Sequence, residues 1–252
     1  HIKADTGLSR LGVLAESVLP FTQELKKLKG LDVEGFATHF ATDDGDDDDG
    51  YFRKQLASFR KIINGLKKEG MGNLMVNGSS SASSIICGKL GFNVVRAGIA
   101  IYGYNSSEYA RIFCKTRKIK LLPALSLKTK VAQVKEIAEG ICVSYGCDFI
   151  SKNKMKIAIL PIGYSDGLDR KLSNKGFVLI RGEKARIIGR VCMNMTIVDV
   201  SSIAGIAPED EVVLIGEQGN KRITADDIAN ISGTINYEVL ARLRESIARY
   251  YV

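Results

Sequence analysis

The chain has 252 residues, of which 45% are hydrophobic and 25% are charged, a composition typical of a globular protein with a sizeable core. No segment approaches the ~20 consecutive apolar residues of a membrane helix, and the N-terminus lacks a signal-peptide pattern, so we expect a cytoplasmic protein. The formal charge is +8, but the lysines are scattered and lack interleaved aromatic motifs, which disfavours a nucleic-acid partner.

In the first half of the chain, short apolar segments alternate with helical periodicity, as in a parallel α/β sheet. Gly30 and Gly70 stand where helix C-terminal caps favour a positive φ. The expected elements are a strand at 2–4, a helix at 13–30, a strand at 34–40, a helix at 51–70, and then the segments 74–77, 79–92 and 93–103.

After Leu122 the pattern changes to strands separated by Gly-rich turns, which predicts a separate β-rich domain. We place the domain boundary shortly before this change and divide the chain into residues 1–116 and 117–252. The expected strands lie within 123–137, 140–146, 156–167, 176–201 and 211–216, with helical periodicity returning at 223–232 and 236–250.

The acidic run TDDGDDDDG at 42–50 resembles a calcium loop at first sight. With Gly50 as the turn glycine, Gly45 falls at the first ligand position and Leu56 at the position of the bidentate Glu. The pattern fails at both ends, so we expect a solvated acidic loop and no metal site.

Five cysteines are present, and no two of them form a CxxC pair. An odd number in a chain of this size argues against a disulfide framework, so we expect reduced and mostly buried thiols. They are Cys87, Cys114, Cys142, Cys147 and Cys192.

Polar side chains follow each predicted strand of the first half, and in α/β barrels the catalytic face lies at these strand ends. Serine hydroxyls, glycine amides and an arginine suit a phosphate monoester, and no nucleotide-binding fingerprint is present. For single positions the simpler interpretation is a structural histidine or a serine turn. The residues are Lys3, Asp5 and Arg10, then His39, then Ser79, Ser80 and Ser81, and then Arg96 and Gly98.

Long collinear segments resemble the pyridoxal-phosphate-dependent alanine racemases, among them HIKADTGLSRLGV, EGFATHFATDD, VVRAGIAIYG, GICVSYG and ILPIGYSDG. The resemblance implies a (β/α)8 TIM-type barrel followed by a C-terminal β-domain, with a terminal helical segment returning to the barrel. It also implies interconversion of L- and D-alanine, D-alanine supply for peptidoglycan, and a head-to-tail homodimer.

By the same resemblance, Arg96 would face the pyridine nitrogen of the cofactor, and His39 would hydrogen-bond Arg96. The phosphate would lie against Ser81, Gly98, Ile99 and Tyr237. The serine is the open choice, because the segment NGSSSAS departs from the family pattern and leaves Ser80 nearly as good a candidate.

Tyr145 in VSYG matches the family's catalytic tyrosine, which would serve as the acid or base on one face of the α-carbon. The alternative is a tyrosine that only packs a sheet edge. Tyr164 and Met193 match residues that, like Tyr145, reach the cofactor of the partner subunit. Lys3 and Arg10 match a pair in which the lysine is carbamylated in some members.

Nothing in the chain resembles the VKANAYGHG-like segment that carries the family's cofactor-binding lysine, which is also a catalytic base. We therefore expect a barrel without its N-terminal strands and a chain that is inactive alone. Ala97, Asn194 and a proline-free tail that favours a helix are smaller departures. Serine racemisation, a non-catalytic relic and a partner subunit of a full-length racemase remain alternatives.

Overall fold

The computed structural model describes residues 1–43, 50–88 and 90–251, and the chain divides into two compact units, His1–Leu122 and Pro123–Val252. The boundary expected at 116/117 falls at the end of α4 (Glu108–Thr116), shortly before this division. Most of the predicted acidic loop lies outside the described residues. Within the described ranges, no helix has the length and hydropathy that a bilayer crossing requires.

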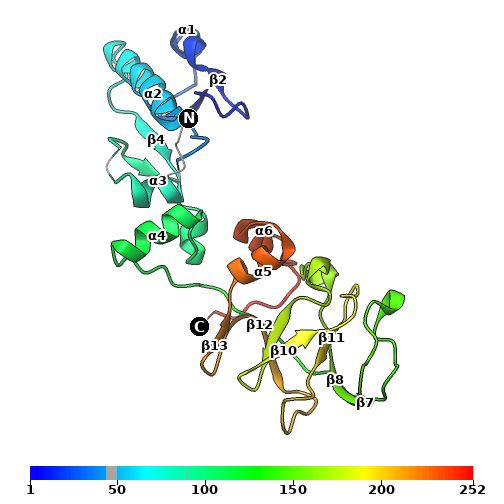
Figure 1. Ribbon diagram of the computed structural model, residues 1–252. Helices are drawn as coiled ribbons and strands as arrows, with labels where there is room; N and C mark the ends of the chain where they lie inside the picture. The colour runs from blue at the N-terminus through cyan, green and yellow to red at the C-terminus, as the bar shows by residue number, and fades with distance from the viewer. Residues whose placement is uncertain (44–49, 89, 252) are drawn as a thin grey trace. The chain divides into compact units, whose positions relative to one another are not determined.

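The first unit contains a five-stranded parallel sheet in the order β2-β1-β3-β4-β5. Figure 1 labels β2 and β4 of this sheet. Strands and helices alternate along the chain, which confirms part of a (β/α) barrel. The strands are β1 (Ile2–Asp5), β2 (Val13–Leu14), β3 (Gly35–Ala37), β4 (Met75–Ser79) and β5 (Val94–Val95), and the helices that precede α4 are α1 (Val18–Leu25), α2 (Tyr51–Lys68) and α3 (Ser81–Ile86).

The helix predicted at 13–30 is shorter in the structure and is preceded by a strand. Val13 and Leu14 pair with Ala4 and Asp5 of β1, so sheet pairing overrides their helical periodicity. Gly70 follows α2 with φ 83°, as the capping pattern predicts. Gly30 also has a positive φ, but it lies beyond the end of α1.

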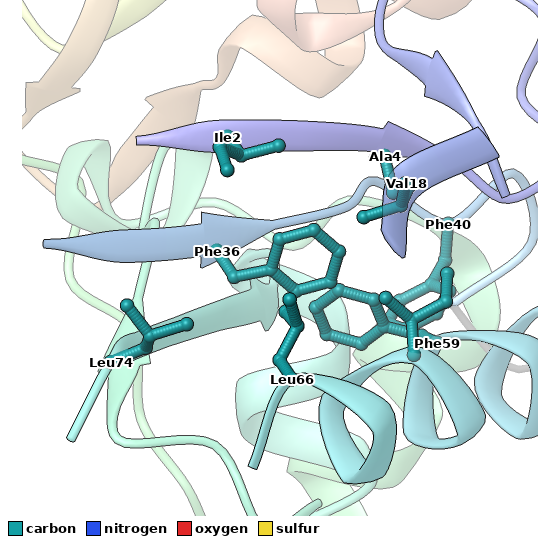
Figure 2. Packing of buried hydrophobic residues seen from close by; sticks show 9 residues of the cluster. Ile2, Ala4, Val18, Phe36, Phe40, Phe59, Leu66 and Leu74 are labelled. Carbon is teal, nitrogen blue, oxygen red and sulfur yellow. The ribbon is translucent and has the colours of Figure 1, made fainter. Parts of the chain in front are cut away.

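The core of the first unit lies between α2 and the sheet (Figure 2). Phe59, Ile62 and Leu66 recur at helical spacing and form the buried face of α2. The ring of Phe59 stacks on Phe36 of β3 with centroids 5.2 Å apart. Full burial of each such side chain contributes about 1.5–3 kcal/mol, so this contact fixes α2 against the strands whose ends carry the polar residues.

The second unit is built on an antiparallel sheet in the order β13-β12-β9-β10-β11-β8-β7, with β6 also paired to β12. The predicted β-rich domain is therefore confirmed. Its strands are β6 (Leu127–Lys130), β7 (Gln133–Ile137), β8 (Met155–Leu160), β9 (Phe177–Ile180), β10 (Glu183–Ile187), β11 (Thr196–Asp199), β12 (Glu211–Gln218) and β13 (Lys221–Ile223), and its helices are α5 (Ala225–Ser232) and α6 (Asn236–Ala241).

The segment 140–146, predicted as a strand, is instead a turn. One isolated bridge joins Cys142 to Ile150, and a 3-10 turn covers Tyr145–Cys147. The expectation of reduced thiols is also wrong here, because Cys142 and Cys147 form a disulfide. The turn brings their Cα atoms to 5.0 Å, within disulfide reach, which counting cysteines cannot detect.

The predicted helical tail is wrong beyond Ala241, where α6 ends. The tail contacts the loop 166–169 instead of continuing its own helical bonds. The Arg244 amide donates to the Asp166 carbonyl at 3.3 Å, and Arg242 donates to the Asp169 carboxylate at 2.9 Å. These tertiary contacts outweigh the helical propensity of the tail.

Candidate active site

Arg96 directly follows β5, at the side of the parallel sheet that is formed by the C-terminal ends of its strands. Its Nη2 donates to the Thr38 carbonyl at 2.8 Å and lies 3.0 Å from His39 Nδ1. Its Nη1 donates to the Asn77 carbonyl at 3.2 Å and also to the Asn77 side-chain oxygen. The guanidinium is therefore held by acceptors from two neighbouring segments of the sheet.

The contact between Arg96 and His39 fixes the state of the imidazole. An arginine has no acceptor, so His39 Nδ1 accepts the bond and the ring proton resides on Nε2. Burial lowers the pKa of His39, and the positive charges of Arg96 and Arg10 lower it further. His39 is thus a neutral acceptor at neutral pH, and Arg96 carries the charge of the pair.

We predict that His39 titrates below its ordinary value of 6.5. Since the folded-state pKa is the lower one, the stability from neutral His39 is complete above pH 6.5 and is lost as the pH falls through the folded-state pKa. An NMR titration of the imidazole Cε1 signal, assigned with a His39→Gln variant, measures this pKa. A midpoint at or above 6.5 would contradict the part-buried hydrogen bond to Arg96.

Sequence reasoning missed two partners of Arg96. Thr38 is fully buried, and its hydroxyl donates to the Ala4 carbonyl at 3.0 Å. This bond holds Thr38, and with it the Thr38 carbonyl that accepts from Arg96, in place. Asn77 is 8% exposed within β4. A polar amide inside the apolar run LMVNGS was the signal for Asn77, because a buried amide requires partners.

Ser81 and Gly98 lie in contact beside this cluster. Ser81 Oγ accepts hydrogen bonds from the Gly98 amide at 2.7 Å and from the Ala100 amide at 3.3 Å. Ser80 has a different task, because its hydroxyl caps α3 by accepting from the Ala82 amide at 3.1 Å. Ile99 is buried and begins the short 3-10 helix after Gly98.

In the described part of the chain, no hydrogen bond or ion pair joins Lys3 to Arg10. Both nevertheless lie near the same centre, because each lowers the pKa of His39. Asp5 shapes the intervening turn, since its Oδ1 accepts from the Gly7 amide at 2.9 Å and the Ser9 amide at 3.1 Å. These backbone bonds lower the pKa of Asp5.

In the second unit, Tyr145, Tyr164 and Met193 line one cavity of about 820 Å³. Two cationic side chains, Arg170 and Arg190, line it as well. Tyr145 is 72% exposed, so its phenol is open to a ligand. Tyr237 lies elsewhere in this unit, on the first turn of α6.

Two glycines, Gly163 and Gly146, allow the segments that line the cavity to approach one another closely. The segment after Gly163 pairs with the Met193 segment, with the Tyr164 amide 3.0 Å from the Cys192 carbonyl. A Cβ on Gly163 would lie 2.2 Å from that oxygen. Gly146 has φ 76°, and a Cβ there would lie 2.6 Å from the Arg190 guanidinium carbon. Both positions therefore exclude a side chain.

The turn that carries Tyr145 has an unusual backbone. Ser144 has φ 64° and ψ −173°, and Cys147 has φ 50°. Each such residue costs about 1–3 kcal/mol and persists only where the surroundings fix it. Ser144 Oγ donates to the Arg190 carbonyl at 2.7 Å, and Asp148 pairs with the Arg190 side chain. Such strain is typical of functional turns.

The chain matches two family models. The model described as alanine racemase, N-terminal domain, matches residues 1–106, and the model described as alanine racemase, C-terminal domain, matches residues 124–251. The chain belongs to the alanine racemase family. Its two matched segments correspond to the two parts of that family, barrel and β-rich domain.

Curated alanine racemases match the whole chain. The alanine racemase of Halothermothrix orenii is 41% identical over 251 residues, covering 100% of this chain and 65% of the relative. Alanine racemase 2 of Caldanaerobacter subterraneus is 41% identical over 257 residues, covering 100% of this chain and 64% of the relative. The chain thus spans about 65% of the length of such alanine racemases.

Solved alanine racemase structures share the fold. The alanine racemase of Bacillus anthracis, with bound L-Ala-P, superposes with a TM-score of 0.88 at 36% identity, covering 97% of this chain and 62% of that chain. The alanine racemase of Clostridium difficile 630 gives a TM-score of 0.89 at 37% identity, covering 100% of this chain and 64% of that chain.

Proposed function

We propose that this chain carries the cofactor-facing and tyrosine-bearing parts of a pyridoxal-phosphate-dependent alanine racemase. Such an enzyme interconverts L- and D-alanine in the cytoplasm and supplies D-alanine for peptidoglycan. The observation that carries the proposal is the Arg96 guanidinium, fixed by Thr38, His39 and Asn77 at the strand-end edge of a racemase-type sheet.

The donor chemistry of the first unit fits pyridoxal phosphate. A Cβ built on Gly98 would meet only Ser81 Oγ, at 3.8 Å, so there is room beside this backbone for a phosphate. The Ser81 hydroxyl is a suitable donor to a phosphate oxygen, and in our proposal the Gly98 amide exchanges its present bond to Ser81 Oγ for a second phosphate oxygen. In our proposal Ile99 completes the phosphate contacts within the first unit.

When bound, pyridoxal phosphate would supply the electron sink that acidifies the Cα–H of alanine. Arg96 would face the pyridine nitrogen. Because a guanidinium offers no acceptor and stays protonated, it leaves that nitrogen without a proton. Arg96 would thereby weaken the sink, which would suit racemisation better than other amino-acid reactions. The contacts of the guanidinium with His39, Asn77 and Thr38 support this role, because they leave it little freedom to turn.

Racemisation requires a proton donor on one face of Cα and an acceptor on the other. We assign one face to the Tyr145 hydroxyl, which reaches the barrel of the partner subunit in a head-to-tail homodimer. Tyr164 and Met193, which line the cavity beside Tyr145, would contact the substrate. Arg10, with Lys3 as a candidate for carbamylation, would orient the substrate from the barrel side. The other face requires a lysine, which we place outside these 252 residues.

A chimera tests the proposal. Joining the lysine-bearing N-terminal segment of an alanine racemase ahead of His1 is expected to produce cofactor colour that survives dialysis and racemisation of alanine. The unjoined chain is expected to show neither. Covalent cofactor retention by the unjoined chain would contradict the placement of the lysine. If the chimera binds the cofactor but prefers serine, the proposed substrate is serine and not alanine. If it racemises neither amino acid, the result favours the alternative that the chain is a non-catalytic partner subunit.

A further inference from the structure

Cys142 and Cys147 form a disulfide whose ring encloses the proposed catalytic residue. The two cysteines are five positions apart in the sequence, with four residues between them, and Tyr145 is one of the four. An extended segment of that length would span roughly 16 Å, whereas the two Cα atoms lie 5.0 Å apart. The disulfide therefore closes a tight turn, and the position of the phenol depends on that turn.

Noncovalent contacts hold the base of this turn. Val143 is 3% exposed and packs with Ile157 and Ile188, and its amide donates to the Phe149 carbonyl at 2.9 Å. Ser144 Oγ is bonded to the Arg190 carbonyl. These contacts end at Ser144, so they do not reach the tip that carries Tyr145.

The tip has weaker noncovalent restraint. Asp148 accepts two hydrogen bonds from the Arg190 guanidinium, but both side chains are more than a third exposed, so solvent screening limits what this pair contributes. Cys147 has φ 50°, a conformation that a non-glycine residue leaves unless something fixes it. The disulfide is the covalent restraint among the described contacts of the tip, and it holds the Cys147 backbone directly.

Both cysteines are exposed in the chain, unlike a structural disulfide in a core. Exposed disulfides are accessible to attacking thiolates and belong to the labile class. The remaining cysteines are free, and Cys114 is buried in the first unit. Cys87 and Cys192 are half-buried and not disulfide-bonded, so among the described residues the exposed Cys142–Cys147 bond is the disulfide open to exchange with small thiols.

We propose that Cys142 and Cys147 form a thiol–disulfide modification site that positions Tyr145, a role that rests on the proposed function. In the oxidising direction, one cysteine thiolate attacks a low-molecular-weight disulfide and releases one small thiol. The second cysteine thiolate then attacks the mixed disulfide and releases another small thiol. Two cysteines lose two electrons and two protons, and one small disulfide becomes two thiols. Excess small thiol drives the reverse reaction.

Mass spectrometry after alkylation in denaturant tests the modification on the 252-residue chain. Equilibration with a small thiol–disulfide pair such as glutathione is expected to protect Cys142 and Cys147 at the oxidising end and to expose them at the reducing end. Cys87, Cys114 and Cys192 should be alkylated throughout. Alkylation of Cys142 and Cys147 across the whole range would overturn the site.

Hydrogen exchange tests the positioning. The Tyr145 and Gly146 amides are expected to exchange about tenfold more slowly in the oxidised chain, while β8 and β11 stay unchanged. A Cys142→Ser, Cys147→Ser double variant should match the reduced chain in either buffer, and a Cys87→Ser variant should respond as the wild type does. Equal exchange of the two amides in both redox states would refute the positioning role.

The racemase chimera separates this inference from the proposed function. We expect reduction to lower its kcat about tenfold with little change in KM, because the phenol moves while substrate contacts remain. A redox-insensitive kcat would count against positioning. A chimera inactive in both states, with exchange still following the redox state, would count against the racemase function and support the redox site.

Discussion

Replacement of Tyr145 by phenylalanine is expected to slow racemisation in the chimera by about 10²–10⁴-fold, the usual contribution of a positioned acid or base. The substitution removes one hydroxyl and keeps the ring, so the cavity with Tyr164 and Met193 should keep its shape. Tyr145 is 72% exposed, and loss of its hydroxyl leaves no buried partner unsatisfied, so stability should be unchanged.

The rate should be measured from L- to D-alanine and from D- to L-alanine, because in both directions the tyrosine would act on the same face of Cα. The Arg96 cluster and the Ser81–Gly98 contact belong to the first unit, so cofactor colour should be retained. Tyr250→Phe is the matched control, since Tyr250 is 86% exposed and has no part in the proposed site. Unchanged turnover of Tyr145→Phe in both directions would remove Tyr145 from the mechanism.

The Gly163→Ala substitution is expected to destabilise the second unit by about 3 kcal/mol, a cost typical of severe overpacking. The new methyl would lie 2.2 Å from the Cys192 carbonyl and 2.5 Å from the Met193 carbonyl. Both atoms are backbone, so no side-chain rotation relieves the clash. The hydrogen bonds from Tyr164 and Ser165 to these carbonyls must lengthen, which separates Tyr164 from Met193.

Amide exchange in β11 measures this loss within the second unit, and exchange in β4 of the first unit is the internal reference. Gly72→Ala is the matched control, because a Cβ at Gly72 meets nothing within 4 Å and its φ is not positive. The control should stay within about 0.5 kcal/mol of the wild type. A Gly163→Ala variant as stable as Gly72→Ala would show that the two loops are not rigidly paired.

Strand and helix alternation in the first half, and β-structure in the second, followed from the sequence because both patterns are local periodicities. The errors have a common cause in tertiary contacts. Val13 and Leu14 joined β1, and the tail after Ala241 bonded to the loop 166–169. Neither partner is within reach of a local pattern.

The candidate site divides in the same way. Residue identity nominated Arg96, His39 and Tyr145, because few side chains offer a permanent cation, a neutral acceptor or a phenol. Which of Ser80 and Ser81 lies against Gly98 was decided by the tertiary structure, since adjacent serines are equivalent as sequence. In the structure one caps a helix and the other meets Gly98.

The sequence by itself determined the family and the kinds of chemical group available, because both are properties of residue order and side-chain type. Tertiary structure alone decided which acceptors hold Arg96, since Asn77 and Thr38 meet it only through the register of β3, β4 and β5. It also decided the Cys142–Cys147 bond, because pairing of two thiols depends on backbone torsions at Ser144, Gly146 and Cys147 that no periodicity encodes.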